Sequence, residues 1–80
     1  MSDIVMPRLT DTMETGVLVS WFVEVGDKVK SGDIIAEIET DKAIMDLEIW
    51  ENGYITYIGV EEGQRIPINN IIAKIENNVR

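Results

Sequence analysis

The five residues Glu39-Thr40-Asp41-Lys42-Ala43 join two alternating apolar runs and decide how this sequence folds. The run before them, residues 34–38, has an apolar side chain at every second position, and so does the run after them, residues 43–49. A period of two is typical of half-buried β-strands. A short polar link between two such strands predicts a hairpin turn, which places Lys42 at an exposed tip. Spacing alone assigns no chemistry to Lys42, since most lysines at turn tips are only solvated charges.

Composition narrows the possible functions of the chain. Its 80 residues suffice for one domain, and they include no cysteine and no histidine. Disulfides, thiolate metal sites and thiol catalysis are therefore excluded, and the commonest general base and metal ligand are missing. A self-contained hydrolase or transferase is thus disfavoured.

Charge and hydropathy limit the partners and the location. The formal net charge of −8 disfavours nucleic acid, which must be bound by neutralising phosphates. Apolar runs never exceed three residues, so we expect no membrane-spanning segment. The start, Met1-Ser2-Asp3, lacks the features of a signal peptide. We therefore expect the bacterial cytoplasm, or the mitochondrial matrix if this is a trimmed eukaryotic protein.

An internal repeat organises the rest of the chain. Residues 16–39, shifted by 37 positions, match residues 53–76 at 9 of 24 positions without a gap. The matches include two glycine pairs, Gly16 with Gly53 and Gly26 with Gly63. We infer two equivalent halves related by a pseudo-two-fold axis.

Each half reads as a series of short strands separated by turns. No stretch shows the 3.6-residue apolar period of a capped helix, so the sequence predicts an all-β sandwich or flattened barrel. Residues 8–15 are expected to form a polar loop, and Pro67 marks an edge or irregular position. From the parity of the runs we expect a buried set of Val5, Val19, Trp21, Val23, Val29, Ile34, Ala36, Ile38, Met45, Leu47, Ile58, Ile66, Ile71, Ala73 and Ile75.

These features together resemble the lipoyl domain of dihydrolipoyl acyltransferases, the core subunits of 2-oxo acid dehydrogenase complexes. The resemblance covers essentially all 80 residues. The pair Thr12-Met13 is most similar to the pyruvate branch of the family. The motifs that carry the resemblance are Met6-Pro7-Arg8-Leu9-Thr10-Asp11-Thr12-Met13, Gly16, Trp21, Val25-Gly26-Asp27-Lys28-Val29, Gly32-Asp33 and Glu39-Thr40-Asp41-Lys42-Ala43.

The resemblance implies a fold and a carrier function. The family fold is a flattened barrel of two four-stranded antiparallel sheets with a pseudo-two-fold axis. Lys42, flanked by Asp41 and Ala43, would hold lipoic acid in amide linkage, so the cofactor would supply the chemistry and the domain would present it. The domain itself would not be catalytic.

The resemblance also implies the partners. A lipoate ligase or lipoyl transferase would modify Lys42, and a thiamin-diphosphate-dependent 2-oxo acid decarboxylase would reductively acylate the lipoyl group. An acyltransferase catalytic domain would pass the acyl group to coenzyme A, and dihydrolipoyl dehydrogenase would reoxidise the dithiol. Loop 8–15 is expected to lie beside the lysine hairpin and to help the decarboxylase select its carrier. The isolated domain is expected to be monomeric.

Two further expectations concern the whole protein and the alternatives. Family members continue into a subunit-binding domain and a catalytic domain, so residues 1–80 are expected to be the N-terminal part of a longer acyltransferase. A biotinyl carrier would place its lysine between two methionines, whereas here the neighbours are Asp41 and Ala43. An unmodified binding module that uses the acidic hairpin face is the alternative from a different class.

Overall fold

The computed structural model describes residues 2–77, and these form eight strands and no helix. Several of the strands are short, as the closely spaced turns of the sequence predict. The predicted all-β fold is confirmed. The strands are β1 (Ser2–Val5), β2 (Thr15–Trp21), β3 (Lys28–Val29), β4 (Ile34–Glu39), β5 (Ile44–Glu48), β6 (Gly53–Ile58), β7 (Arg65–Pro67) and β8 (Ile71–Glu76).

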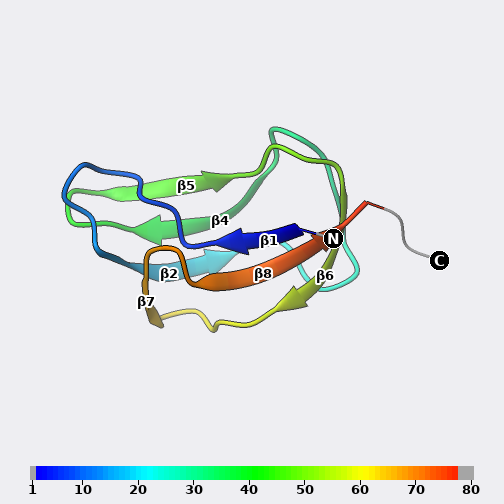
Figure 1. The fold of residues 1–80 in the computed structure, drawn as a ribbon. Coiled ribbons are helices and arrows are strands. Elements are labelled where there is room, and N and C mark those ends of the chain that lie inside the picture. The colour runs from blue at the N-terminus through cyan, green and yellow to red at the C-terminus, as the bar shows by residue number, and fades with distance from the viewer. Residues whose placement is uncertain (1, 78–80) are drawn as a thin grey trace.

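The strands form two four-stranded antiparallel sheets (Figure 1). One sheet has the order β1-β8-β6-β3 and the other has the order β5-β4-β2-β7. Pro67 therefore lies in an edge strand, where its missing N–H removes no ladder bond. In the part of the chain that the structure describes, no helix is long and apolar enough to cross a membrane.

Matching hydrogen bonds show the pseudo-two-fold symmetry directly. The amide of Gly26 donates to the carbonyl of Ile55 at 2.7 Å, and 37 residues on the amide of Gly63 donates to the carbonyl of Leu18 at 2.6 Å. The two glycines share positive φ values of 99° and 91°, a conformation that glycine adopts without steric cost. The repeat found in the sequence is therefore a repeat of backbone structure.

One short strand from each half of the sequence pairs with a strand of the other half. Strand β3, from the first half, pairs with β6, and strand β7, from the second half, pairs with β2. The edge strands β1 and β5 occupy equivalent ends of the two sheets. Neither half of the sequence can therefore complete a sheet on its own.

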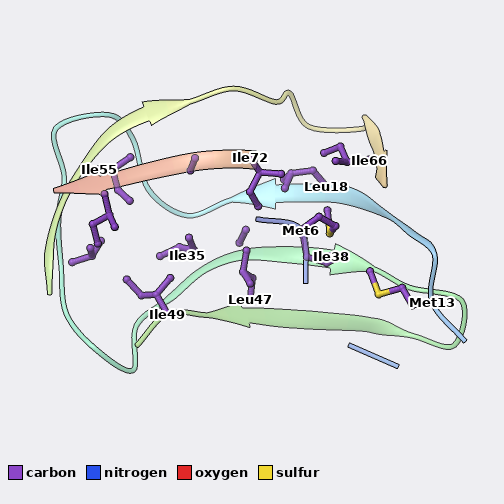
Figure 2. Packing of buried hydrophobic residues seen from close by; sticks show 14 residues of the cluster. Met6, Met13, Leu18, Ile35, Ile38, Leu47, Ile49, Ile55, Ile66 and Ile72 are labelled. Atoms are coloured by element: carbon purple, nitrogen blue, oxygen red, sulfur yellow. The ribbon is translucent and has the colours of Figure 1, made fainter. Parts of the chain in front are cut away.

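The core fills the space between the two sheets (Figure 2). Among the described residues no polar or charged side chain is buried, so the core is held by apolar packing alone. Partly buried Trp21 and Val23 pack against it. The buried residues are Met6, Met13, Leu18, Val29, Ile35, Ala36, Ile38, Leu47, Ile49, Ile55, Ile66, Ile72, Ala73 and Ile75.

The predicted buried set was partly wrong. It is correct for Val29, Ala36, Ile38, Leu47, Ile66, Ala73 and Ile75. Val5, Ile34 and Ile71 are exposed instead, with exposed fractions of 36–44%. The partly buried residues are Val19, Trp21, Val23, Met45 and Ile58. The buried residues outside the predicted set are Met6, Met13, Leu18, Ile35, Ile49, Ile55 and Ile72.

Shifts in strand register explain several of the errors within the strands. Strand β4 slips against β5 between Ile34 and Ala36, so that Ile35 and Ala36 are both buried and Ile34 faces solvent. Strand β2 shifts against β4 between Leu18 and Ser20, which buries Leu18 rather than Val19. An extra residue in one strand reverses the facing of all residues beyond it. Strict alternation therefore predicted the wrong face on one side of each irregularity.

Candidate functional site

The turn between β4 and β5 comprises residues 40–43, with Asp41 and Lys42 at its centre. The amide of Thr40 donates to the carbonyl of Ala43 at 2.8 Å and closes the turn. Neither central residue has a positive φ, as expected for the type I turns around which four-residue hairpin loops are usually built. Side chains at its ends can give such a turn further support.

The Thr40 side chain supplies that support. Its hydroxyl oxygen accepts hydrogen bonds from the amides of Lys42 at 3.1 Å and Ala43 at 3.0 Å, and it donates to the carbonyl of Ala43 at 2.7 Å. Side-chain hydroxyls of serine and threonine mimic backbone turns in this way. The backbone on both sides of Lys42 is thus fixed by hydrogen bonds.

Lys42 lies at the tip of this turn, and its side chain is exposed. Asp41 and Ala43 are exposed as well. The exposed tip predicted for Lys42 is confirmed. A primary amine in this position is accessible to a modifying enzyme.

The first loop of the chain reaches the tip and contacts Asp41. The hydroxyl of Thr10 donates to the Asp41 carboxylate at 2.6 Å, and the hydroxyl of Thr12 donates to its second oxygen. Figure 1 shows this loop beside the β4–β5 turn, at the end of the molecule away from the amino terminus. The predicted closeness of loop 8–15 and the lysine hairpin is confirmed, while the two threonine contacts had no signal in a single sequence.

These two hydroxyl groups change the acidity of Asp41. The hydrogen bond from Thr10, and next the one from Thr12, favour the charged carboxylate and lower the pKa of Asp41 below its ordinary value of 3.8. The nearby Lys42 charge acts in the same direction with a smaller effect. Asp41 is therefore ionised at neutral pH and remains an acceptor for both threonines.

Buried side chains and hydrogen bonds fix the position of the first loop. Met6, which precedes it, and Met13, near its end, have exposed fractions of 0% and 1%. Figure 2 shows Met13 at the hairpin end of the core. The Arg8 guanidinium donates to the carbonyl of Met13 at 2.8 Å. The loop is thus held in place at both of its ends.

An open polar groove runs beside the tip. Its volume is about 340 Å³, and its walls come from the first loop, β2 and the start of the turn. Arg65 lies at its border and donates to the Thr15 hydroxyl at 3.0 Å. Within residues 2–77 no cluster of acidic side chains could hold a metal ion. The lining residues are Thr12, Glu14, Thr15, Val17, Glu39, Thr40, Asp41 and Arg65.

Comparison with known proteins identifies similar domains. The sequence model of the family described as "Biotin-requiring enzyme" matches residues 2–75. A solved structure, the lipoyl domain of the 2-oxoglutarate dehydrogenase complex from Azotobacter vinelandii, is similar with a TM-score of 0.79 and 28% sequence identity, over 98% of this chain and 100% of that one. The fold inferred from the resemblance is thereby confirmed.

The curated relatives are acetyltransferase components of pyruvate dehydrogenase complexes. The chain is 51% identical over 72 residues to the one from Rhizobium meliloti, which covers 89% of this chain and 16% of the relative. It is 51% identical over 69 residues to the mitochondrial one from Saccharomyces cerevisiae, which covers 85% of this chain and 14% of the relative. The chain thus spans about a seventh to a sixth of the length of these relatives.

Proposed function

This chain belongs to the family of biotinyl and lipoyl domains described as "Biotin-requiring enzyme", and from that premise we propose that Lys42 carries a covalently attached lipoyl group. The observation that supports this most is the position of Lys42. It is the exposed central residue of a turn that is fixed by Thr40 on one side and by the contact of Asp41 with the first loop on the other.

The choice of a lipoyl group over biotin rests on the neighbours of the lysine and on the relatives. Asp41 and Ala43 flank Lys42, where the biotinyl pattern has methionines. The similar solved structure is a lipoyl domain, and the curated relatives are dihydrolipoyllysine acetyltransferase components. The family model alone includes both groups and does not separate them.

The site meets the chemical requirement for attaching a lipoyl group. Amide formation needs an accessible primary amine, and the exposed Lys42 provides one. When attached, the group supplies a disulfide that can accept an acyl group together with two electrons. The chain itself orients the attachment point through Thr40, and it presents the acidic Asp41 and the first loop as a recognition surface.

The proposed partners follow from this role. A lipoate ligase or lipoyl transferase attaches the group, and a 2-oxo acid decarboxylase, for which pyruvate is the proposed substrate, loads it. The acyltransferase catalytic domain and dihydrolipoyl dehydrogenase then unload and reoxidise it. Tethering on one lysine raises the effective concentration of the group at each of these sites. Residues 1–80 would be the N-terminal carrier domain of a longer acyltransferase.

Location and assembly stay predictions. The relatives come from bacteria and from mitochondria, which agrees with a bacterial cytoplasmic or a mitochondrial matrix protein. Sedimentation of the isolated domain tests the expected monomer, and fractionation of the source cells tests the compartment.

Attachment at Lys42 can be tested by mass spectrometry after incubation with a lipoate ligase. Lys42→Arg should abolish the mass increase without unfolding the domain, because the side chain is exposed and contributes nothing to the core. Lys28→Arg, at another exposed lysine, is the matched control and should be modified like the wild type. Modification mapped to any other lysine would contradict the proposal.

Exchanging Asp41 and Lys42 tests whether the turn positions the amine. The exchange keeps composition and net charge but moves the amine by one place, which changes its direction and its reach. Because small misplacements of reacting atoms can slow a reaction by orders of magnitude, lipoylation should nearly disappear. Circular dichroism confirms folding, and efficient lipoylation of the exchanged protein would refute positioning by the hairpin.

A further inference from the structure

A second groove lies between the edge strands of the two sheets, away from the lysine tip. It is lined by residues of β1 and the following Pro7 on one side and by the end of β5 with Trp50 on the other, and its volume is about 270 Å³. Strand β5 separates it from the turn, and at about 3.3 Å per residue this strand extends about 13 Å from Ile44 to Glu48. The lipoyl attachment site does not include it.

The apolar part of this groove ends in an exposed indole. Leu47 and Ile49, both at least nine-tenths buried, belong to its lining, and Figure 2 shows them on the side of the core formed by β5. Val5 is 36% exposed and Trp50 is 72% exposed, the highest fraction among the exposed large hydrophobic residues of the described chain. A tryptophan this exposed contributes little to folding, and such side chains are enriched at contact surfaces.

The rest of the lining is acidic. Asp3, Glu48 and Glu51 are acidic lining residues, and no lysine or arginine is among the lining residues in the described part of the chain. Three carboxylates beside an indole form a surface that attracts cations, because the π face of tryptophan binds guanidinium and ammonium groups. Charge complementarity therefore selects a positively charged occupant.

The groove lies where the two halves of the molecule meet. The amide of Met6 donates to Asn70 at 2.8 Å, and the amide of Ile49 donates to Asp33 at 3.0 Å in the equivalent turn of the other half. These bonds fix the backbone on both walls. The groove is therefore a preformed feature, and an occupant need not order it.

We propose that this groove, which we call the Trp50 groove, binds a basic polypeptide segment that carries an arginine or lysine next to an aliphatic side chain. The aliphatic side chain packs against Val5 and Ile49, and the cation lies over Trp50 within reach of Glu48 and Glu51. The site would dock the domain onto a partner by a surface that leaves the lysine tip uncovered. The proposal does not depend on the lipoyl group, so failure of either one leaves the other standing.

Peptide titration of the ¹⁵N-labelled, unlipoylated domain tests this proposal. The probe is a blocked hexapeptide, acetyl-Gly-Leu-Arg-Leu-Lys-Gly-amide, followed through the two indole N–H signals. The Trp50 signal should shift saturably. The Trp21 indole donates to the Val60 carbonyl at 3.0 Å inside the fold and should not move. A peptide with glutamate in place of arginine and lysine should not bind, and one with glycine in place of leucine should bind about fivefold more weakly.

Matched variants separate the groove from the general charge of the domain. Glu51→Gln should weaken binding about threefold or more, whereas Asp46→Asn, which removes the same charge from outside the groove, should leave it within about twofold. The Trp50→Ala variant has no Trp50 indole signal, so its binding is followed through the backbone amide of Ile49. Its affinity for the peptide should fall about fivefold or more. Phe22→Ala, another exposed aromatic outside the groove, should bind like the wild type.

Four outcomes would overturn the proposal. The Trp50 signal could fail to respond to the leucine–arginine peptide. The glycine-substituted peptide could bind equally well, or Asp46→Asn could weaken binding as much as Glu51→Gln, which would show nonspecific attraction to an acidic domain. The signal could also shift with protein concentration alone, which would make the groove a contact between two copies of this chain.

Discussion

Asp41 is the residue through which two segments distant in the chain meet beside Lys42. Its carboxylate accepts from Thr10 and Thr12, residues that lie 31 and 29 positions away in the sequence. Because a charged acceptor strengthens such bonds, the contact depends on the ionisation of Asp41. The folded-state pKa of Asp41 is lowered, so the contact is complete at neutral pH and is lost only as pH falls through that lowered pKa.

This dependence gives a prediction for the double variant Thr10→Val, Thr12→Val. Valine has the shape of threonine but cannot donate, so the pKa of Asp41 should rise toward its ordinary value. A carboxyl-detected NMR titration measures the change in the pKa of Asp41. Thr15→Val is the control, because the Thr15 hydroxyl accepts a hydrogen bond from Arg65 instead. An unchanged Asp41 titration in the double variant would show that the hydroxyl groups do not donate to it in solution.

Two glycines allow close packing that no other residue permits. A Cβ at Gly16 would lie 2.7 Å from Met13 and 2.8 Å from Ile38, and a Cβ at Gly53 would collide with the backbone oxygen of Glu76. Gly16→Val should lower the free energy of unfolding by about 1–3 kcal/mol through overpacking.

Urea unfolding followed by circular dichroism measures this loss for Gly16→Val. Gly59→Ala is the matched control, because its added Cβ would meet only the exposed side chain of Tyr57, which can move aside. It should change the free energy of unfolding by less than about 1 kcal/mol. Equal stability of the Gly16 variant and the wild type would contradict the packing described around Met13.

At the scale of elements, the hairpin and the exposure of its lysine could be predicted from the sequence. Which residues of several strands face the core could not. Alternation around residues 39–43 continues without interruption on the β5 side, so the turn and the exposure of Lys42 followed from period two alone. In β4 the side chains of Ile34 and Ile35 are chemically identical, and only the register shift decides which is buried. The bonds from Thr10 and Thr12 to Asp41 depend on tertiary placement, which local patterns do not encode.

We expect the first loop, residues 8–15, to affect the acylation of the lipoyl group by the decarboxylase. We do not expect it to affect the attachment of that group to Lys42. Alanine substitutions from Thr10 to Glu14 should slow reductive acylation by the decarboxylase, because this loop and the turn form one continuous surface. Lipoylation should persist, since the Thr40 bonds that shape the turn remain.

Met13 should be left unchanged in this series because it is buried. Single-turnover kinetics with the decarboxylase measures loading, and mass spectrometry measures attachment. Substitutions at Glu24 and Asp27 are the surface control. These residues lie in another turn and do not line the groove beside Lys42. Wild-type acylation rates for all loop variants would show that the loop is only a connector.

For the whole molecule, the exchange of strands between halves makes folding a property of the complete chain. A fragment of residues 1–51 contains β1 to β5, but β1 would lack β8, β3 would lack β6, and β2 would lack β7. We expect this fragment to show no cooperative unfolding transition and little dispersion in its proton NMR spectrum, whereas the full chain shows both. A cooperatively folded fragment would mean that one half can close its own core.

The pairing of the first strand with the last also sets an order of events during synthesis. Ser2 pairs with Ile75, so β1 has no partner until β8 has left the ribosome. Lys42 and its hairpin, formed by neighbouring residues, emerge well before that moment. The loop that β1 anchors cannot settle against Asp41 until β8 arrives. A partner enzyme that recognises the settled loop, as we expect of the decarboxylase, would therefore act on finished domains and pass over nascent ones.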